Sequence, residues 1–232
     1  MAEQPTASQL NKLGDRLRKG TATADDVRVL NNFRESFRPA YEQVVSALES
    51  LNLEVGGRSA KTIGSIVAKV AREKTRLSTM QDIAGCRVEV PNRVEQDRIV
   101  GEIVKLFPES RIDDLRQTPS HGYRAVHVIV TVDARPVEIQ VRTTLQNTWA
   151  QVTERFADRF EAAVKYGGGP ESVRKILQES SDLLDQFEKL EKDLLNSGKL
   201  PTDYYDKLID IKTTLQGLLR QLMVEDVSEL EV

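Results

Sequence analysis

Alternating apolar and polar positions between residues 122 and 143 predict two neighbouring strands. In the later segment, three aliphatic side chains alternate with three polar ones, which are Glu138, Gln140 and Arg142. In the earlier segment, four valines share one face, and Tyr123 and His127 share the opposite face. A strand that carries a carboxylate, an amide and a guanidinium in a row is poor at burying both of its faces. The polar faces therefore indicate either the wet side of an antiparallel sheet or a shared cleft.

Helical spacing of apolar residues predicts helices over 24–52, 59–75 and 93–106, and a further helix with Leu145, Trp149 and Phe156. A shorter amphipathic segment precedes the first of these, Gly56-Gly57 is expected to break the chain, and strands are predicted at 83–90 and 109–115.

Past Pro170, two leucine-rich stripes separated by residues 196–201 predict an αα-hairpin. Eight of its side chains are expected to be buried against a partner surface, in the same chain or across a dimer: Leu183, Leu184, Phe187, Leu190, Leu215, Leu218, Leu219 and Leu222.

The composition is that of a globular protein of one or two domains, with 39% hydrophobic and 30% charged residues in 232. No apolar run approaches the ~20 residues that span a bilayer, and the N-terminus lacks the pattern of a secretory signal, so a cytoplasmic location is expected. One cysteine and two histidines argue against a disulfide framework and a zinc site. Cys86 lies in an apolar strand and is expected to be a core residue rather than a nucleophile.

Charge is distributed unevenly along the chain. Residues 1–165 hold 25 Lys and Arg against 22 Asp and Glu, a net of +3, whereas residues 166–232 hold 8 against 14, a net of −6. The two values sum to the total of −3. A mildly basic first part suits an anionic substrate.

A stripe of basic residues is expected on one face of the predicted helix over 59–75. At 100° per residue its members fall within a narrow arc: Arg58, Lys61, Ser65, Lys69, Arg72 and Arg76. Cations stacked on one helix face repel each other unless an anion or carboxylates compensate them. The stripe therefore indicates an anion site, and the alternative is a solvated basic face flanked by Glu73.

Three motifs in order resemble the synthetase domain of the RelA/SpoT family, which makes alarmone nucleotides. They are D-I-A-G-C-R at 82–87, G-Y-R-A-V-H at 122–127 and E-I-Q-V-R-T at 138–143, and they follow the basic stripe. The resemblance covers residues 55–165 and identifies a small alarmone synthetase with a synthetase domain only. It implies an α+β, nucleotidyltransferase-like fold with a mixed sheet of about five strands flanked by helices. N-terminal helices over 1–54 and a C-terminal helical hairpin over 170–232 would flank this core.

The resemblance also implies residue roles. Asp82 would bind Mg²⁺, and Glu138 would contact the metal or act as the base. Arg58 and Arg87 would sandwich adenine. The triphosphate of ATP would be held by Lys61, Ser65, Lys69 and Arg72. The acceptor would be bound by Tyr123, His127, Gln140 and Arg142.

The implied reaction moves the β,γ-pyrophosphate of ATP to a ribose 3′-hydroxyl of GDP or GTP, which makes (p)ppGpp-type alarmones of the stringent response. The loop before Tyr123 departs from the family pattern P-K-x-N-G-Y, because Ser120 and His121 replace the lysine and asparagine. This departure leaves open a toxic subgroup, from toxin–antitoxin or phage-defence systems, which makes adenosine alarmones or pyrophosphorylates the tRNA 3′-CCA end and so inhibits translation.

A tRNA path would need cations, for which the candidates are Lys12, Arg16, Arg18 and Lys19, or Arg155, Arg159 and Lys165. A third hypothesis is an inactive module that senses a nucleotide or partner, although retention of both Asp82 and Glu138 argues against it. A homo-oligomer or a neutralising protein could bind through the C-terminal helices.

Overall fold

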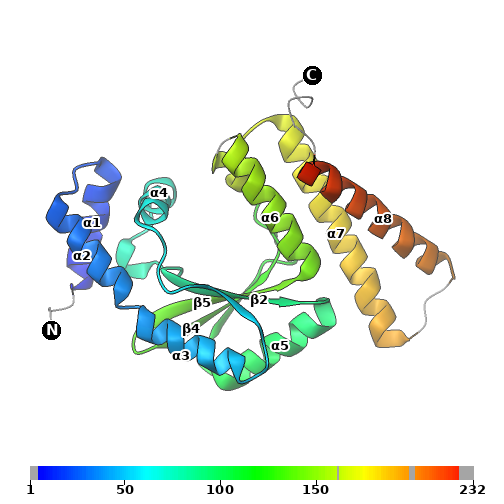
Figure 1. Cartoon of the computed structure of the whole chain (residues 1–232), viewed down its shortest axis with the longest axis horizontal. Coiled ribbons are helices and arrows are strands. Elements are labelled where there is room, and N and C mark those ends of the chain that lie inside the picture. Colours follow the sequence, from blue (N-terminus) through cyan, green and yellow to red (C-terminus); the bar gives the residue numbers. More distant parts are fainter. Residues whose placement is uncertain (1–4, 161, 199–201, 225–232) are drawn as a thin grey trace. The chain divides into compact units, whose positions relative to one another are not determined.

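The computed structural model describes residues 5–160, 162–198 and 202–224 (Figure 1). The elements run in the order α1 (Ala7–Lys19), α2 (Ala24–Glu35), α3 (Arg38–Glu49), β1 (Val55–Arg58), α4 (Ile63–Glu73), β2 (Ala84–Val90), α5 (Arg93–Leu106), β3 (Arg111–Asp114), β4 (Val126–Val132), β5 (Arg135–Thr143), α6 (Thr144–Arg159), α7 (Glu171–Ser197) and α8 (Thr202–Val224). Short 3₁₀ turns lie at Leu77–Thr79 and Ala162–Tyr166.

The strands form one five-stranded sheet in the order β1-β2-β5-β4-β3. Strands β1 and β2 are antiparallel. A two-residue turn joins β4 to β5, and both of its residues, Asp133 and Ala134, have positive φ angles of 48° and 58°. Two consecutive positive φ angles are typical of the type I′ turn, whose twist matches that of a β-hairpin. The expected α+β class and the mixed sheet of about five strands are thus confirmed for the described residues.

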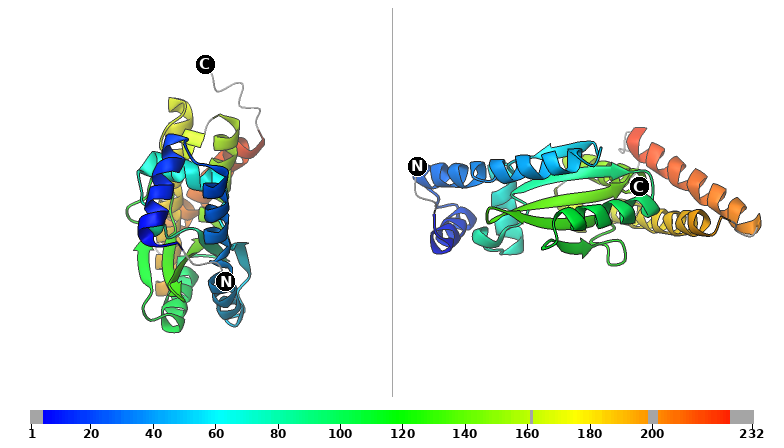
Figure 2. Two further views of the ribbon diagram at one scale, coloured as in Figure 1. Left: turned by 90° about the vertical axis from the view of Figure 1, so that its left-hand side faces the viewer. Right: turned by 90° about the horizontal axis from the view of Figure 1, so that it is seen from below.

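The chain divides into two compact units. One contains residues 1–88, 103–112 and 128–140, and the other contains 89–102, 113–127 and 141–232. In the first unit, α1 packs against α4 and α3 contacts β1. In the second unit, α6, α7 and α8 pack against one another, and the views in Figure 2 show α7 and α8 as its two long helices. Among the described helices, none is both long and apolar enough to cross a lipid bilayer.

The single helix predicted over 24–52 is two helices, α2 and α3, which meet at Ser36 and Phe37. Pro39 lies in the first turn of α3. Proline lacks an N–H and is tolerated only where that hydrogen bond is not required, at the start of a helix. The apolar periodicity continues across the break, so spacing alone did not reveal it.

The helix predicted over 59–75 is shorter, and the expected basic stripe is only partly correct. Residues 55–58 form strand β1, so Arg58 lies on a strand. Thr62 is the N-cap of α4, where its hydroxyl oxygen accepts a hydrogen bond from the Ser65 N–H, and the helix ends at Lys74, which has a φ of 51°. Lys61 and Arg76 also lie outside the helix, which leaves Ser65, Lys69 and Arg72 on α4.

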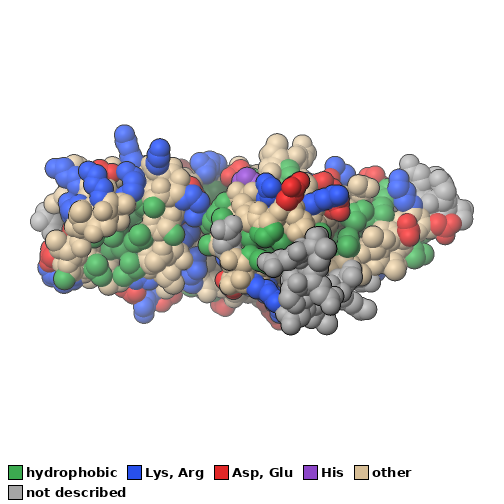
Figure 3. All heavy atoms as spheres, turned by 90° about the horizontal axis from the view of Figure 1, so that it is seen from above, with side chains coloured by type: hydrophobic (Ala, Val, Ile, Leu, Met, Phe, Trp, Pro, Cys, Tyr) green, Lys and Arg blue, Asp and Glu red, His purple; other side chains and the backbone are tan. Residues whose placement is uncertain are grey.

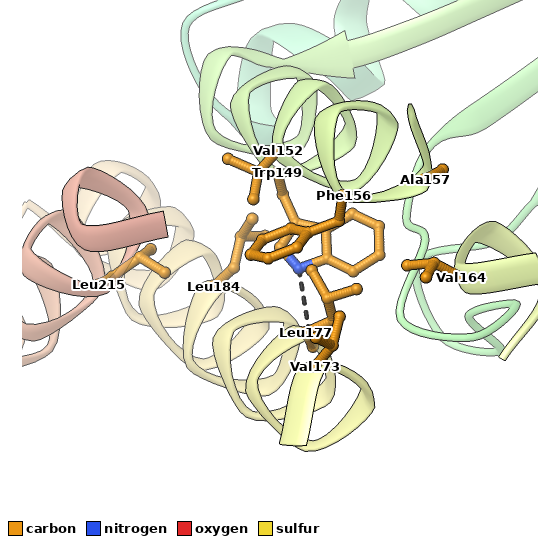
Figure 4. Close-up of a cluster of buried hydrophobic side chains, with 9 residues drawn as sticks. All are labelled: Trp149, Val152, Phe156, Ala157, Val164, Val173, Leu177, Leu184 and Leu215. Carbon is orange, nitrogen blue, oxygen red and sulfur yellow. Dashed lines mark hydrogen bonds between the residues drawn. The ribbon is translucent and has the colours of Figure 1, made fainter. Parts of the chain in front are cut away.

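The second unit has a core built around the only tryptophan of the chain (Figure 4). The Trp149 side chain is buried, and its indole N–H donates to the carbonyl oxygen of Leu177 (3.1 Å) and to the hydroxyl of Ser180 (3.0 Å). The core draws buried side chains from α6, α7 and α8, which are Trp149, Val152, Phe156, Ala157, Val173, Leu177, Leu184 and Leu215, together with Val164. The helical hairpin therefore completes a core of this unit.

The expected burial of the hairpin stripe is confirmed for Leu184, Phe187 and Leu215, which are nearly inaccessible to solvent. Leu183, Leu190 and Leu218 are partly buried. The side chains of Leu219 and Leu222 lie outside the described residues. The partner surface is in the same chain, because Leu184 and Leu215 belong to the cluster around Trp149.

Replacing Leu184 by Ala is expected to lower the free energy of unfolding by about 2–5 kcal/mol, because Leu184 is 1% exposed and its removal leaves a cavity. The matched control is Leu195→Ala on the same helix, where the side chain is 52% exposed. That change is expected to cost about 0.5 kcal/mol or less. Urea denaturation of both variants checks this expectation, and equal midpoints would contradict the assignment of the hairpin to the core.

Candidate active site

Arg58 and Arg87 lie on the same face of the β1–β2 ribbon. The register pairs Arg87 with Gly56 and Arg58 with Gly85. Residues directly opposite one another in an antiparallel pair share a face, as do alternate residues of one strand. The two arginines are therefore diagonal neighbours, and both are exposed. Glycines occupy the other diagonal, and a Cβ atom on Gly56 would lie 3.8 Å from the Nη2 atom of Arg87.

This arrangement offers a floor without side chains between two guanidinium groups. Diagonal neighbours in an antiparallel pair are roughly 7–8 Å apart. A flat ring placed between two groups needs about 3.5–4 Å on each side for van der Waals contact. Arg58 and Arg87 therefore have a spacing suited to stacking on both faces of one planar ring.

Asp82, just before β2, is held by two lysines. Its Oδ2 atom accepts hydrogen bonds from the Nζ atoms of Lys61 (2.6 Å) and Lys69 (2.9 Å), and Lys69 also lies 3.8 Å from a carboxylate oxygen of Glu73. The Lys61 N–H donates to the carbonyl oxygen of Ile83 (2.6 Å), which closes the loop between β1 and α4 against the start of β2. Two cations therefore converge on one oxygen of one carboxylate.

Burial opposes ionisation of Asp82, but the ammonium groups of Lys61 and Lys69 outweigh it and lower the pKa of this carboxyl. The other carboxylate oxygen, Oδ1, is buried and has no hydrogen-bond partner in the described part of the chain. A buried carboxylate oxygen without a donor is a ligand available to a hard cation, so Asp82 fits a Mg²⁺ site. The described residues hold no cluster of three or more His, Cys, Asp and Glu side chains, and Mg²⁺ sites use one or two carboxylates plus phosphate oxygens.

The remaining residues expected at the triphosphate lie on α4. The hydroxyl of Ser65 accepts a hydrogen bond from that of Thr62 (2.8 Å) at the first turn. Arg72 forms a salt bridge with Glu73 (2.7 Å), near the exposed end of the helix. Lys61 and Lys69 thus share Asp82, whereas Arg72 pairs with a surface carboxylate.

Glu138 lies on β5, the strand next to β2. Its backbone oxygen would be 3.3 Å from a Cβ atom on Gly85. The amide nitrogen of Gln140 donates to the Oε2 atom of Glu138 at 2.6 Å. The resemblance places Gln140 at the acceptor, and that role stays a prediction, because a hydrogen bond to Glu138 does not test it. Its amide fixes the orientation of Glu138.

Tyr123, His127 and Arg142 form a connected cluster in the second unit. The Tyr123 hydroxyl accepts hydrogen bonds from the Nη2 (2.9 Å) and Nε (3.2 Å) atoms of Arg142, and lies 2.9 Å from the Nε2 atom of His127. The guanidinium carbon of Arg142 is 5.0 Å from the centre of the tyrosine ring, which is a cation–π contact. Strand alternation placed Tyr123 with His127 and placed Arg142 on the polar face of the other segment. The structure brings all three together, but Tyr123 lies in the loop before β4 rather than on a strand.

Sequence reasoning missed the two glycines of the β1–β2 floor and the capping role of Thr62. The glycines carried a signal, because the spacing Gly-x-Arg occurs in both segments, at 56–58 and at 85–87. Recognising it required the register of the two strands, which the sequence does not state.

Cys86 is buried, as expected for a core residue. Burial, with a smaller contribution from the nearby Glu138 carboxylate, raises the pKa of its thiol to about 12.

Because the thiolate is the reactive form, Cys86 should not react with Ellman's reagent in the folded protein at pH 7–8. In 6 M guanidinium chloride, one thiol per chain should react within minutes, since the sequence has a single cysteine. Absorbance of the released thionitrobenzoate measures both rates. Rapid labelling of the native protein, with circular dichroism confirming that it is folded, would show that the thiol is accessible.

The family model and a curated relative that match this chain point to the same family. A family model described as a region found in RelA / SpoT proteins matches residues 57–161. GTP pyrophosphokinase YjbM of Bacillus subtilis is 32% identical over 151 residues, which are 58% of this chain and 68% of that protein. An uncharacterized protein of Mycobacterium tuberculosis strain H37Rv is 41% identical over 118 residues. This match covers 49% of the present chain and 43% of the mycobacterial relative.

Solved structures with the same fold include small alarmone synthetase 1 of Bacillus subtilis. One crystal structure of it is 25% identical, with a TM-score of 0.55 over 72% of this chain and 96% of that chain. A second, bound to its product pppGpp, is 23% identical, with a TM-score of 0.56 over 77% of this chain and all of that chain. Because the second structure is only 23% identical, its similarity supports a shared fold and nothing more.

Proposed function

This chain belongs to the RelA/SpoT family, and from that premise we propose that it is a Mg²⁺-dependent pyrophosphokinase. It transfers the β,γ-pyrophosphate of ATP to the ribose 3′-hydroxyl of a purine nucleotide, GDP or GTP, and releases AMP. The products are alarmones of the (p)ppGpp type. YjbM carries the name GTP pyrophosphokinase, and the proposal extends that activity to this chain.

The observation that carries the proposal is the environment of Asp82. Two lysines bind one oxygen of this carboxylate, and the other oxygen is buried with no donor among the described residues. Lys61, Lys69 and Arg72 carry three positive charges against the two carboxylates of Asp82 and Glu73, so this cluster has a local charge of +1. It is therefore suited to a polyphosphate. Phosphate oxygens would replace Asp82 as the hydrogen-bond partners of the two lysines, and the carboxylate would then be available to bind a metal ion.

The chain's own residues divide the work of the donor side. Arg58 and Arg87 stack on the adenine ring, and Lys61 and Lys69 bind triphosphate oxygens, with Ser65 and Arg72 contributing from α4. Asp82 and Glu138 are the carboxylates for Mg²⁺, which when bound supplies charge neutralisation at the transferred phosphates. Glu138, oriented by Gln140, accepts the proton of the attacking hydroxyl.

On the acceptor side, Tyr123 stacks on the purine base. Arg142 donates two hydrogen bonds to its hydroxyl, and His127 contacts the same oxygen. The hydrogen bonds hold the hydroxyl end of the phenol, and the guanidinium of Arg142 over one face of the ring restricts its plane before the acceptor arrives, which lowers the entropy cost of binding.

The tRNA alternative has weaker support from the candidate cations. Figure 3 shows Lys and Arg side chains gathered over α1, α2 and α4. Several of the candidate cations for tRNA, however, are already paired. Arg16 forms a salt bridge with Asp26 (2.5 Å), Arg18 with Asp15 (3.0 Å), and Lys165 with Glu154. Paired cations contribute less to phosphate binding than unpaired ones, because their carboxylates must first be displaced.

Identification of the acceptor tests the proposal. Purified protein with Mg²⁺ and γ-labelled ATP is incubated separately with GDP, GTP, ATP or deacylated tRNA. Label in a guanine nucleotide product supports the proposal. Label in tRNA or in a new adenine nucleotide product would establish the transfer reaction but show that the acceptor is not a guanine nucleotide. Label in none of them would refute the enzymatic function and favour a nucleotide-sensing module.

Glu138→Gln is expected to lower the transfer rate by about 10²–10⁴-fold, the usual effect of losing a general base. The substitution is nearly isosteric, so ATP affinity should stay within a few-fold. Product formation from labelled ATP and equilibrium binding of a non-hydrolysable ATP analogue measure the two properties. Glu42→Gln, an exposed carboxylate on α3, serves as the control. More than a tenth of the wild-type rate in the Glu138 variant would refute its role.

Arg58→Ala and Arg87→Ala are each expected to weaken ATP binding by a few-fold to ~30-fold, because each removes one stacked guanidinium worth roughly 0.5–2 kcal/mol. Isothermal titration with the ATP analogue measures the loss. Arg28→Ala, an exposed arginine on α2 that pairs with Asp25, should bind as the wild type does. Wild-type affinity in both test variants would rule out the adenine sandwich.

A further inference from the structure

The loop that carries Tyr123 is fastened at its base. This acceptor loop comprises residues 116–124. Immediately outside it, the Leu115 N–H donates to the Ala125 carbonyl (3.0 Å), and inside it the Arg124 Nη1 atom donates to the Arg116 carbonyl (2.5 Å). The Tyr123 N–H donates to the Ser120 carbonyl (2.9 Å), which closes a tight turn. The backbone next to the tyrosine is therefore constrained.

Three side chains from α7 reach this loop. Asp182 (3.1 Å) and Asp185 (3.5 Å) pair with Arg124, whereas Ser181 contacts the loop on both sides of Tyr123. The Ser181 hydroxyl donates to the carbonyl oxygen of Gly122 (2.6 Å) and accepts from the Nε atom of Arg124 (3.0 Å). A hydroxyl has one donor and can accept at the same time, so both bonds form together. Ser181, Gly122 and Arg124 are all buried. The residues before and after Tyr123 are thus joined to a single atom on α7.

Gly122 packs tightly against the side chains of Trp149 and Ser181. A Cβ atom there would lie 2.8 Å from the Trp149 ring and 3.3 Å from the Cβ atom of Ser181, and the φ angle is 84°. Only glycine fits both the conformation and the space. The loop therefore rests directly on α6 and α7, with no intervening side chain.

The α7 helix is itself fixed on the same side. Glu188 is 1% exposed and accepts hydrogen bonds from Arg93 (2.8 Å), Gln146 (2.9 Å) and Thr143. Asp185, one turn earlier, pairs with Arg93 (2.7 Å). Breaking such a buried pair leaves an uncompensated charge, so α7 has little freedom to shift under the loop.

We propose that Ser181 on α7, together with Arg124, is a positioning residue of the acceptor subsite, and that α7 sets the ring position of Tyr123 through the backbone of Gly122 and Arg124. The inference rests on the proposed function for the role of Tyr123. It makes α7 a determinant of acceptor affinity that acts through the backbone of the acceptor loop.

Ser181→Ala tests the proposal against a matched control, Ser180→Ala. Both hydroxyls are buried on neighbouring positions of α7 and both are hydrogen-bonded, but Ser180 serves the Trp149 indole, which keeps its bond to Leu177. Initial rates at varied acceptor and varied ATP give the two KM values and kcat. Ser181→Cys, which nearly keeps the volume but offers only a weak donor, is a second test variant.

The Ser181 variants should raise the KM for the acceptor by about 5- to 50-fold, since they remove a buried hydrogen-bond partner from two polar groups. The KM for ATP and kcat at saturating acceptor should change less than twofold. Ser180→Ala should lower the thermal midpoint by about as much as Ser181→Ala does, but it should leave both KM values unchanged. Equal effects of the two alanine variants on acceptor KM would reduce Ser181 to a packing residue and overturn the proposal.

Hydrogen exchange separates a failure of this inference from a failure of the proposed function. Exchange at the amides of residues 117–123 should be at least fivefold faster in Ser181→Ala than in wild type or Ser180→Ala. If exchange is faster in Ser181→Ala but the wild-type protein has no transferase activity, Ser181 anchors the loop and the proposed enzymatic function is wrong. Unchanged exchange would overturn the anchoring, whatever the activity.

Discussion

Compensation of clustered cations by carboxylates is the constraint on which this structure depends. Placing ammonium and guanidinium groups near one another, away from water, is costly unless carboxylates and hydrogen bonds balance them. The chain meets this constraint differently in its two units. In the first unit, Lys61 and Lys69 share Asp82. In the second, Arg93 contacts both Asp185 and Glu188. The cluster at Asp82 is incompletely compensated, as suits a reactive site, whereas the network at Glu188 is fully hydrogen-bonded, as suits a structural role.

The cluster at Asp82 is balanced only in part. With Glu73 and Arg72 included it has more positive than negative charge, and one oxygen of Asp82 has no donor in the part of the chain that the structure describes. Such a cluster keeps capacity for both an anion and a cation. The network around Glu188 has no such capacity, because Glu188 receives bonds from an arginine, a glutamine and a threonine. A fully satisfied buried network rigidifies its surroundings, which suits the support of a binding loop.

Much of the fold follows from local sequence, and its limits are physical. The strand at 83–90 and the helix over 93–106 are close to the observed β2 and α5, because their periodicity is strong. The break at Ser36 was missed because the apolar spacing continues across it, and strand β1 was missed because it is defined by its pairing with β2 rather than by a local pattern. In the site, strand alternation paired Tyr123 with His127, whereas their grouping with Arg142 came from the family resemblance. The bond between Ser181 and Gly122 joins residues 59 positions apart, which no local pattern encodes.

The acidic character of residues 166–232 acquires a specific meaning from these contacts. Asp182 and Asp185 pair with Arg124, and Glu188 pairs with Arg93, so carboxylates of α7 are used inside the unit. Burial opposes ionisation of Asp185, but hydrogen bonds from Lys189 and Arg93 outweigh it and lower its pKa. Its charge therefore favours the folded state at neutral pH. The sign asymmetry along the sequence thus reflects complementary surfaces within one folded unit, where acidic residues of α7 meet the arginine that follows Tyr123.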